Sequence, residues 1–450
     1  MTSIVPGRRG ALAATVGAGA LLATAAPALA QEAATAVPRD SAFIFNTLLF
    51  LMGGFLVMFM AAGFAMLEAG MVRSKNVAMQ CTKNIALYSI SGLMFWLIGY
   101  SLMYPGDDGW IVQDFVGKIA TYPTQAVGAG VDQGTYSVAS DWFFQMVFCA
   151  ATASIVSGTV AERIKLWPFL IFVAILTGII YPIQGSWEWG AGFLDDLGFS
   201  DFAGSTLVHS TGGWAALAGA IFVGSRIGKY GPDGKVNPLP GSSMPLATLG
   251  TFILWLGWFG FNGGSQLAMG TIGDVSDVSR IFVNTNLAAA GGVVAALLLT
   301  QILYGKVDLT MALNGALAGL VSITAEPLQP SVPLAILIGA VGGVIVVFTV
   351  PLLDKLKIDD VVGAIPVHLF AGIWGTMVVP VSNSDANFGS QFIGVAAVGI
   401  FVFVASSVLW GLLKVTIGLR PSEEEEVMGL DLADIGVEAY PEFGSGSQRI

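Results

Sequence analysis

The chain has 450 residues, of which 55% are hydrophobic and only 11% charged, and its mean hydropathy is +0.76. This composition excludes an ordinary soluble domain, and apolar runs of about 20 residues recur that are each long enough to cross a bilayer as a helix. The formal net charge is −11, to which the acidic last 30 residues contribute −7, and no basic patch indicates a nucleic-acid partner. The sequence therefore predicts an all-α polytopic membrane protein.

Residues 1–30 have the pattern of a secretory signal peptide. An Arg-Arg pair precedes an apolar stretch, and Ala28-Leu29-Ala30 forms an A-x-A cleavage site. An uncleaved first transmembrane helix is the alternative, but the run is short and rich in Ala and Gly. We expect cleavage, so that residues 31–40 begin the mature chain outside the cytoplasm.

Eleven transmembrane helices are expected after the signal. Their approximate positions are 42–68, 79–103, 141–160, 166–184, 202–225, 246–268, 281–304, 309–325, 332–350, 363–381 and 391–416. In this arrangement the cytoplasmic segments carry twelve Lys and Arg residues and the outer segments three, so the positive-inside rule places residue 40 outside and the C-terminus inside. The mature chain then divides into a transmembrane domain, residues 31–420, and an acidic cytoplasmic tail, residues 421–450.

The motif D-x-x-G-x-x-x-V-H occurs twice, from Asp201 to His209 and from Asp360 to His368, and its histidines are the only two in the chain. The predicted topology makes the two motif helices antiparallel. That pattern is typical of an inverted duplication, here about residues 40–225 and 245–381, with an eleventh helix at about 391–416.

The two histidines are expected to meet near the middle of the membrane. Each lies eight residues after its aspartate, about 12 Å along a helix. An imidazole in an apolar run needs a partner, and two imidazoles in contact could relay a proton. A structural hydrogen bond between helices is the alternative.

The acids near the helix ends are interpreted as structural. Asp201 and Asp360 stand at helix starts, where a carboxylate accepts hydrogen bonds from free backbone N–H groups. Glu68 near the inner end of the first span, and the neighbours Glu162 and Arg163, are likewise expected to be loop or structural groups rather than pore groups. The spacing of chemistry-bearing residues predicts no enzyme, no cofactor and no metal site.

Six motifs in order make the sequence resemble the ammonium transporter family over about residues 40–443. They are F-x-x-x-F before A-E-R (144–163), E-W-G (188–190), D-F-A-G-S-T-x-V-H (201–209), G-W-F-G-F-N-x-G-S (257–265), D-D-V-V-G-A-I-P-V-H (359–368), and G-L-R with the later G-L-D and A-Y-P (418–441). The chain departs from a common family version at Ile435-Gly436, where His-Gly is usual, and it has Pro366 two residues before the second histidine.

The resemblance implies a role for seven residues. Trp189, Phe148 and Ser265 correspond to an outer cation-recruiting site, and Phe148 and Phe261 to two stacked rings that close the pore. The remaining three are the paired histidines of the lumen and a supporting acid: His209, His368 and Asp201. The alternatives to these roles are an interfacial anchor for Trp189, packing for Phe148 and Phe261, which is the more frequent role of such residues when viewed alone, and local helix packing for Ser265.

The resemblance further implies an ammonium transporter that deprotonates NH4+ on the periplasmic side, conducts ammonia and relays the proton separately. An electroneutral ammonia channel and a non-conducting receptor that signals through the tail are the alternatives. The expected partners are ammonium or ammonia, the lipid bilayer, two further copies in a homotrimer, and a cytoplasmic PII signalling protein. The expected location is the bacterial inner (plasma) membrane.

Overall fold

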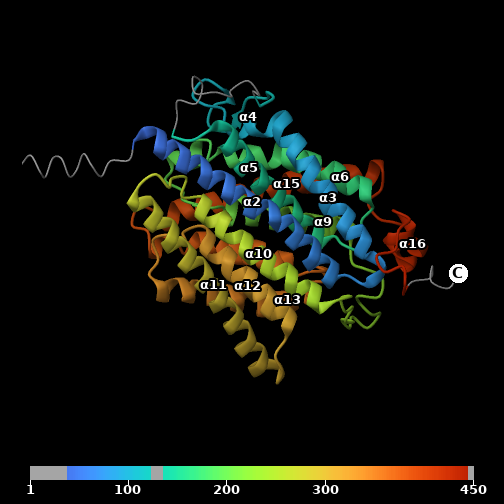
Figure 1. The fold of residues 1–450 in the computed structure, drawn as a ribbon. Coiled ribbons are helices and arrows are strands. Elements are labelled where there is room, and N and C mark those ends of the chain that lie inside the picture. Colours follow the sequence, from blue (N-terminus) through green and yellow to red (C-terminus); the bar gives the residue numbers. More distant parts are fainter. Residues whose placement is uncertain (1–37, 123–134, 444–450) are drawn as a thin grey trace, which may run out of the picture.

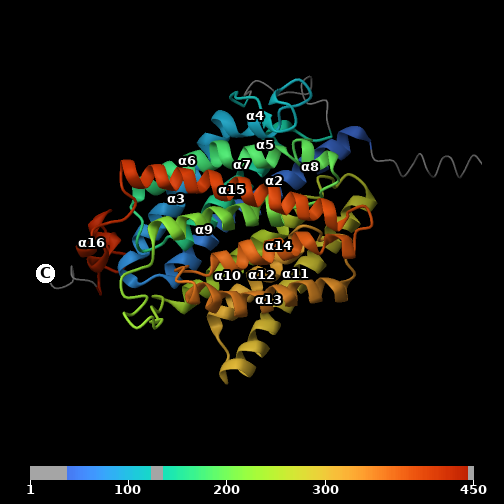
Figure 2. The ribbon, with the colours of Figure 1, turned by 180° about the vertical axis from the view of Figure 1, so that it is seen from behind.

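The computed structural model describes residues 38–122 and 135–443, so the predicted signal peptide lies outside the described residues. The described chain is a bundle of long helices with one short hairpin (Figures 1 and 2). The elements of the first half are α2 (Arg39–Met71), η1 (Ser74–Asn76), α3 (Val77–Met94), η2 (Phe95–Gly99), α4 (Tyr100–Met103), β1 (Trp110–Val112), β2 (Val116–Gly117), α5 (Val138–Thr159), α6 (Leu166–Ile175), η3 (Leu176–Ile180), α7 (Tyr181–Ser186), α8 (Phe193–Asp196), η4 (Ser205–Ser210) and α9 (Thr211–Val223). The elements of the second half are α10 (Met244–Gly264), α11 (Ile272–Tyr304), α12 (Leu309–Thr324), α13 (Val332–Lys355), η5 (Ile365–Phe370), α14 (Ala371–Met377), η6 (Val379–Val381), α15 (Phe388–Thr416), α16 (Glu423–Met428) and α17 (Leu430–Ala433).

Nine helical segments of the described chain are long and apolar enough to cross a membrane. Two shorter apolar segments, Leu309–Thr324 and Ile365–Val381, fall on the eighth and tenth predicted ranges. Each of the other nine predicted ranges overlaps one of the long segments. The helices also present large apolar side chains outward, where lipid would cover them. Examples are Phe55, Ile85, Phe252, Ile302, Phe348 and Phe392.

Glycines bring α2 and α10 into close contact along the bundle. A Cβ added at Gly63 would lie 3.1 Å from the Gly250 carbonyl oxygen, and one added at Gly260 would lie 2.6 Å from the Gly53 carbonyl oxygen. In lipid, hydrophobic burial adds little to the association of helices. Close packing of their backbones at small residues therefore supplies much of the stability. The glycine-rich composition therefore explains how these two long apolar helices pack closely.

The bundle has two ends, which we call the hairpin face and the tail face. The hairpin face carries β1 and β2, which pair antiparallel, and it is the end at which α2 begins. The tail face carries α16 and lies at the end where α2 finishes (Figure 1).

Residues 421–443, the part of the acidic tail that the structure describes, are folded against the tail face. Helix α3 has no side-chain cap of its own, and the carboxylate of Asp431 accepts hydrogen bonds from its first free N–H groups, those of Ala78 (3.0 Å) and Met79 (2.8 Å). The N–H of Leu430 donates to the side chain of Asn76 at 2.9 Å. A carboxylate near a helix N-terminus is favourable to both partners, so the tail completes α3 from more than 350 residues away along the chain.

Candidate functional site

The two histidines meet in the centre of the bundle. Their Nδ1 atoms lie 3.2 Å apart, and their ring centroids lie 5.2 Å apart. His209 and His368 are 1% and 3% exposed. At this distance one Nδ1 must carry a proton and the other must accept it, since two N–H groups or two lone pairs would repel. The pair therefore shares one hydrogen bond whose direction can reverse.

Both histidines lie in π-helical turns, η4 and η5. Such turns displace side chains from the regular helix positions and are frequent at functional sites. The glycine four residues after each histidine lets the two turns approach. A Cβ at Gly213 would lie 2.7 Å from the backbone N of Leu369, and one at Gly372 would lie 2.5 Å from the carbonyl oxygen of Ser205. The repeated glycines of the motif thus allow the contact between the repeated histidines.

The carboxylate of Asp201 holds the start of η4. It accepts four backbone N–H groups, from Gly204 (3.1 Å), Ser205 (2.7 Å), Thr206 (2.8 Å) and Leu207 (2.8 Å). Burial raises the pKa of Asp201 to about 6, against these hydrogen bonds, which favour the carboxylate. The side chain does not contact His209 directly; it fixes the turn that carries the ring.

Asp360 has the equivalent place before η5. Its carboxylate accepts from the N–H of Ile365 at 2.7 Å and from the hydroxyl of Thr159 at 3.0 Å. Burial raises its pKa as well. Pro366 follows at the start of the turn, where a missing N–H costs little because that group has no helical partner.

Two phenyl rings lie on the hairpin side of the histidine pair, and one of them, Phe261, contacts His209. Phe148 and Phe261 are stacked with centroids 3.9 Å apart and an interplanar angle of 22°. Phe261 also lies 5.2 Å from His209, and the indole of Trp258 stacks on His209 at 4.8 Å and lies 5.7 Å from Phe261, all between ring centroids. Both phenyl rings are at most 1% exposed, so they close the passage in this structure.

A cavity of about 510 Å³ opens above the rings on the hairpin face; we call it the outer cavity. Phe148, Trp189 and Ser265 all line it, as the resemblance implies. The Ser265 hydroxyl donates to the carbonyl of Phe261 at 2.9 Å, which leaves its oxygen lone pairs to accept from a ligand. The indole N–H of Trp189 donates to the carbonyl of Asp201 at 3.2 Å, which fixes the ring beside Phe148.

Several outer-cavity residues were not identified from the sequence. They are Tyr100, Tyr104, Tyr136, Asp141 and Gln145. The carboxylate of Asp141 accepts from the Tyr100 hydroxyl at 2.7 Å. An acid at the start of an apolar span is a signal that sequence reasoning could have used, because such groups usually face a cavity or another helix.

Below the histidines two further cavities continue towards the tail face. The first, the histidine cavity, has a volume of about 10 Å³ and is lined by His368, Phe64, Glu68 and Asn314 among others. The second, the tail-face cavity, has about 150 Å³ and is lined by Asn314 as well, with Asp360 and Pro366. The outer cavity, the ring stack, the histidine pair and these two cavities therefore follow one another through the bundle.

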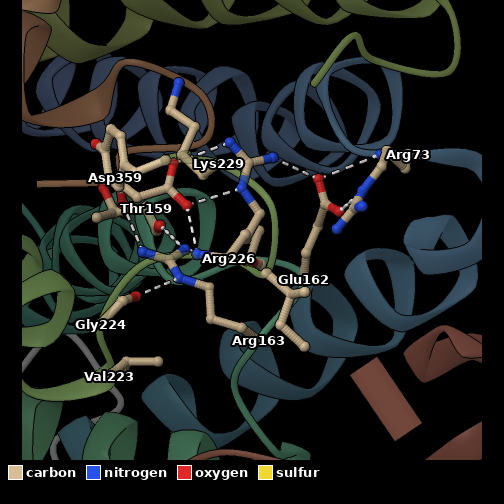
Figure 3. Close-up of polar contacts among 12 residues, drawn as sticks. Arg73, Thr159, Glu162, Arg163, Val223, Gly224, Arg226, Lys229 and Asp359 are labelled. Carbon is tan, nitrogen blue, oxygen red and sulfur yellow. Dashed lines mark hydrogen bonds and ion pairs between the residues drawn. The ribbon is translucent and has the colours of Figure 1, made fainter. Parts of the chain in front are cut away.

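A network of charges closes the tail face beside this exit (Figure 3). Glu162 forms ion pairs with Arg73 and with Arg226, the latter at 2.7 Å. Arg226 also forms an ion pair with Asp359, at 2.9 Å. Arg163 donates instead to backbone carbonyls, among them that of Gly224 at 2.9 Å, so the sequence neighbours Glu162 and Arg163 have different partners. Burial opposes the charge of Asp359, but the nearby arginines hold its pKa well below the ordinary value.

Comparison with known proteins decides the family. The model of the Ammonium Transporter Family matches residues 48–440. The chain belongs to the ammonium transporter family. The protein named ammonium transporter Amt2 of Archaeoglobus fulgidus is 41% identical over 421 residues, which is 87% of each chain, and Amt2 of Haloferax mediterranei is 39% identical over 87% of this chain and 89% of its own.

Solved structures agree with this family. A protein titled Sensor Amt Protein superposes with a TM-score of 0.83 at 36% identity and covers 88% of this chain and 100% of its own. Mep2 of Candida albicans superposes with a TM-score of 0.76 at 28% identity, over 90% of this chain and 92% of its own. This member of the ammonium transporter family is therefore a multi-pass membrane protein with the fold of these relatives.

Proposed function

We propose that this ammonium transporter recruits NH4+ in the outer cavity, deprotonates it there, and conducts ammonia past the histidine pair while the proton moves separately along the imidazoles. The observation that carries this proposal is the contact of Phe261 with both Phe148, on which it stacks, and His209, because it puts an apolar barrier and a proton-carrying pair in series. Trp189, Ser265 and His368 have roles that follow from the cost of moving a small cation through an apolar passage.

The outer cavity suits ammonium chemically. The faces of Trp189 and Phe148 attract a cation with about 0.5–2 kcal/mol, depending on desolvation. The Ser265 oxygen can accept one of the four N–H groups. Carrying the intact ion between two stacked rings would cost several kcal/mol or more, which exceeds this attraction. Loss of the proton removes most of the cost, so neutral ammonia passes. Potassium has no proton to lose and is rejected.

The histidine pair suits a proton relay. Its single Nδ1···Nδ1 hydrogen bond can pass a proton from one ring to the other and reset by a change of tautomer. Transport is then electrogenic, because ammonia and the proton both reach the tail face. The test is the current on an ammonium jump in proteoliposomes: a current with ammonium and none with potassium supports the proposal, whereas robust ammonia uptake without current supports the electroneutral channel.

A receptor is the second candidate, because the solved structure with the TM-score of 0.83 is titled Sensor Amt Protein. Here the docked tail would carry the signal. Growth on limiting ammonium separates the two. A transporter-deficient cell that expresses this chain grows if it conducts, and fails to grow, with ammonium binding retained, if it only senses.

The surroundings of the protein are also proposals. We place it in a bacterial inner membrane as a homotrimer, with the hairpin face in the periplasm and the tail face in the cytoplasm, and with eleven spans in two inverted repeats. The basic residues of the tail face support this orientation. A cytoplasmic PII protein is the proposed regulator. Mass measurement of the detergent-solubilised protein, alone and with PII, tests both assemblies.

A further inference from the structure

Two charged side chains lie inside the bundle, and one of them, Glu68, lines the histidine cavity. Glu68 on α2 is 1% exposed and Lys83 on α3 is 0% exposed. Gln80 links them: its amide donates to Glu68 at 2.6 Å, and its carbonyl accepts from Lys83 at 3.1 Å. Ser157 also contacts both, through its hydroxyl to Glu68 and its carbonyl to Lys83, each at 2.8 Å. Charged groups within a membrane helix are costly, and they usually mark a pathway.

The hydrogen bonds of Lys83 and Glu68 differ in one respect. The Lys83 ammonium has two carbonyl partners and lies 4.6 Å from the centre of the Phe169 ring. In Glu68 both hydrogen bonds go to Oε2, and the buried Oε1 has no hydrogen-bond partner. A buried carboxylate oxygen without a partner is rare, because it loses its hydration without compensation. The Oε1 atom of Glu68 can therefore accept a hydrogen bond from a water molecule.

Glu68, whose Oε1 has no hydrogen-bond partner, belongs to the lining of the histidine cavity. Glu68 and His368 both line this space of about 10 Å³, together with the polar residues Ser154 and Asn314. A cavity of roughly 10–15 Å³ holds one water molecule when it offers two to four polar partners. One water between the His368 imidazole and the Glu68 carboxylate would give a continuous hydrogen-bonded path between two titratable groups.

We propose that Glu68 is the proton acceptor on the tail side of the histidine pair. The N–H bond of the His368 imidazolium breaks as the bridging water takes the proton, and an O–H bond of that water breaks as its proton forms the O–H bond of the Glu68 carboxyl group. The imidazolium and carboxylate become a neutral imidazole and a neutral acid, so charge and atoms balance. Lys83 stays charged nearby and favours the return to carboxylate, which releases the proton to water through the tail-face cavity.

This inference rests on the electrogenic transport proposed above and adds the next residue of its proton path. It differs from the interpretation made from the sequence, in which Glu68 is only structural. Since loss of Glu68 alone would strand the Lys83 charge, the decisive variant is the double substitution Glu68→Gln/Lys83→Met, which removes both charges together. Glu68→Asp retains a carboxylate at the same place.

Two readouts in proteoliposomes are needed, the current on an ammonium jump and the permeability to ammonia from stopped-flow pH measurement. We expect the double variant to keep ammonia permeability within about twofold of wild type while its current falls by roughly tenfold or more, as for loss of a proton-transfer group. Glu68→Asp should keep a measurable current. The control is Glu326→Gln, because Glu326 is also a buried carboxylate but binds Asn383 and backbone N–H groups and should give wild-type current.

Each outcome decides. Wild-type current in the double variant overturns the proposal. Loss of current together with ammonia permeability also overturns it, because Glu68 and Lys83 would then only maintain the structure of the lumen. Absence of current in the wild-type protein would instead overturn the electrogenic function itself. The two failures are therefore distinguishable.

Discussion

The Nδ1 atoms of His209 and His368 lie 3.2 Å apart, although 159 residues separate them in the chain. Each ring stands in a π-helical turn, each turn begins after an aspartate, and each is followed by a glycine that admits the other turn. The same local arrangement therefore occurs twice, and one hydrogen bond between the two histidines joins its two copies. This arrangement holds the two imidazoles in contact.

The outer aromatic site is tested by Trp189→Leu. Loss of the indole face removes a cation–π attraction of about 0.5–2 kcal/mol, so the half-saturating ammonium concentration should rise about 2- to 30-fold. Concentration series of ammonium-evoked current measure it. Trp110→Leu, in the hairpin at the same face, is the control and should leave the half-saturating concentration unchanged. Equal responses in both variants would contradict a binding role for Trp189.

The ring stack is tested by Phe261→Ala. The deleted ring leaves space beneath Phe148 in the proposed passage, which can take up water, so the loss of stability should stay below the roughly 3–5 kcal/mol of a Phe→Ala change in a closed core. Ammonium selectivity should fall, measured as the ratio of potassium to ammonium current. The control is Phe144→Ala, which removes a buried ring 4.7 Å from Phe148. If Phe144→Ala lowers selectivity equally, the stack has no special role.

The fold of the bundle follows closely from the sequence, whereas the detail of the site follows only in part. Apolar runs determine where helices lie, because every backbone group in lipid must be bonded internally. The predicted span 202–225 begins at Ser205 instead, since Asp201 caps the turn and Gly204 has a left-handed φ of 101°. The π-helical turns leave no periodic signal, so their positions were not predicted. The position of Glu68 at the histidine cavity was not predicted either, because it depends on the rotation of α2 about its own axis relative to the other helices.

The capping carboxylate is tested through pH. The folded-state pKa of Asp201 is about 6, above its unfolded value of about 3.9. The folded state therefore binds this proton more tightly, and the contribution of Asp201 to stability grows as pH falls from about 6 towards 4. Asp201→Asn removes this proton binding. As the pH falls from 7 to 5, the thermal unfolding temperature of the wild type should rise relative to that of the variant. A difference independent of pH would contradict the raised pKa.

The docked tail is tested by Asp431→Ala. The substitution removes the carboxylate that accepts from Ala78 and Met79, and loss of such a cap costs about 0.5–2 kcal/mol. Hydrogen exchange of α17 and of the first turn of α3 should therefore become faster together. In the control Asp434→Ala, the lost contact is to the N–H of Leu166, so α3 should keep its protection. Unchanged exchange at α3 in Asp431→Ala would show that the tail does not cap it.

The central claim is that a proton crosses the bundle along the two imidazoles while ammonia passes beside them. The measurement that tests it most directly is the current after equal ammonium and potassium jumps, recorded for wild type, His209→Ala and His368→Ala at matched protein density. The claim predicts current in wild type with ammonium alone and a loss of roughly tenfold or more in each variant. Wild-type ammonium current in both histidine variants would contradict it.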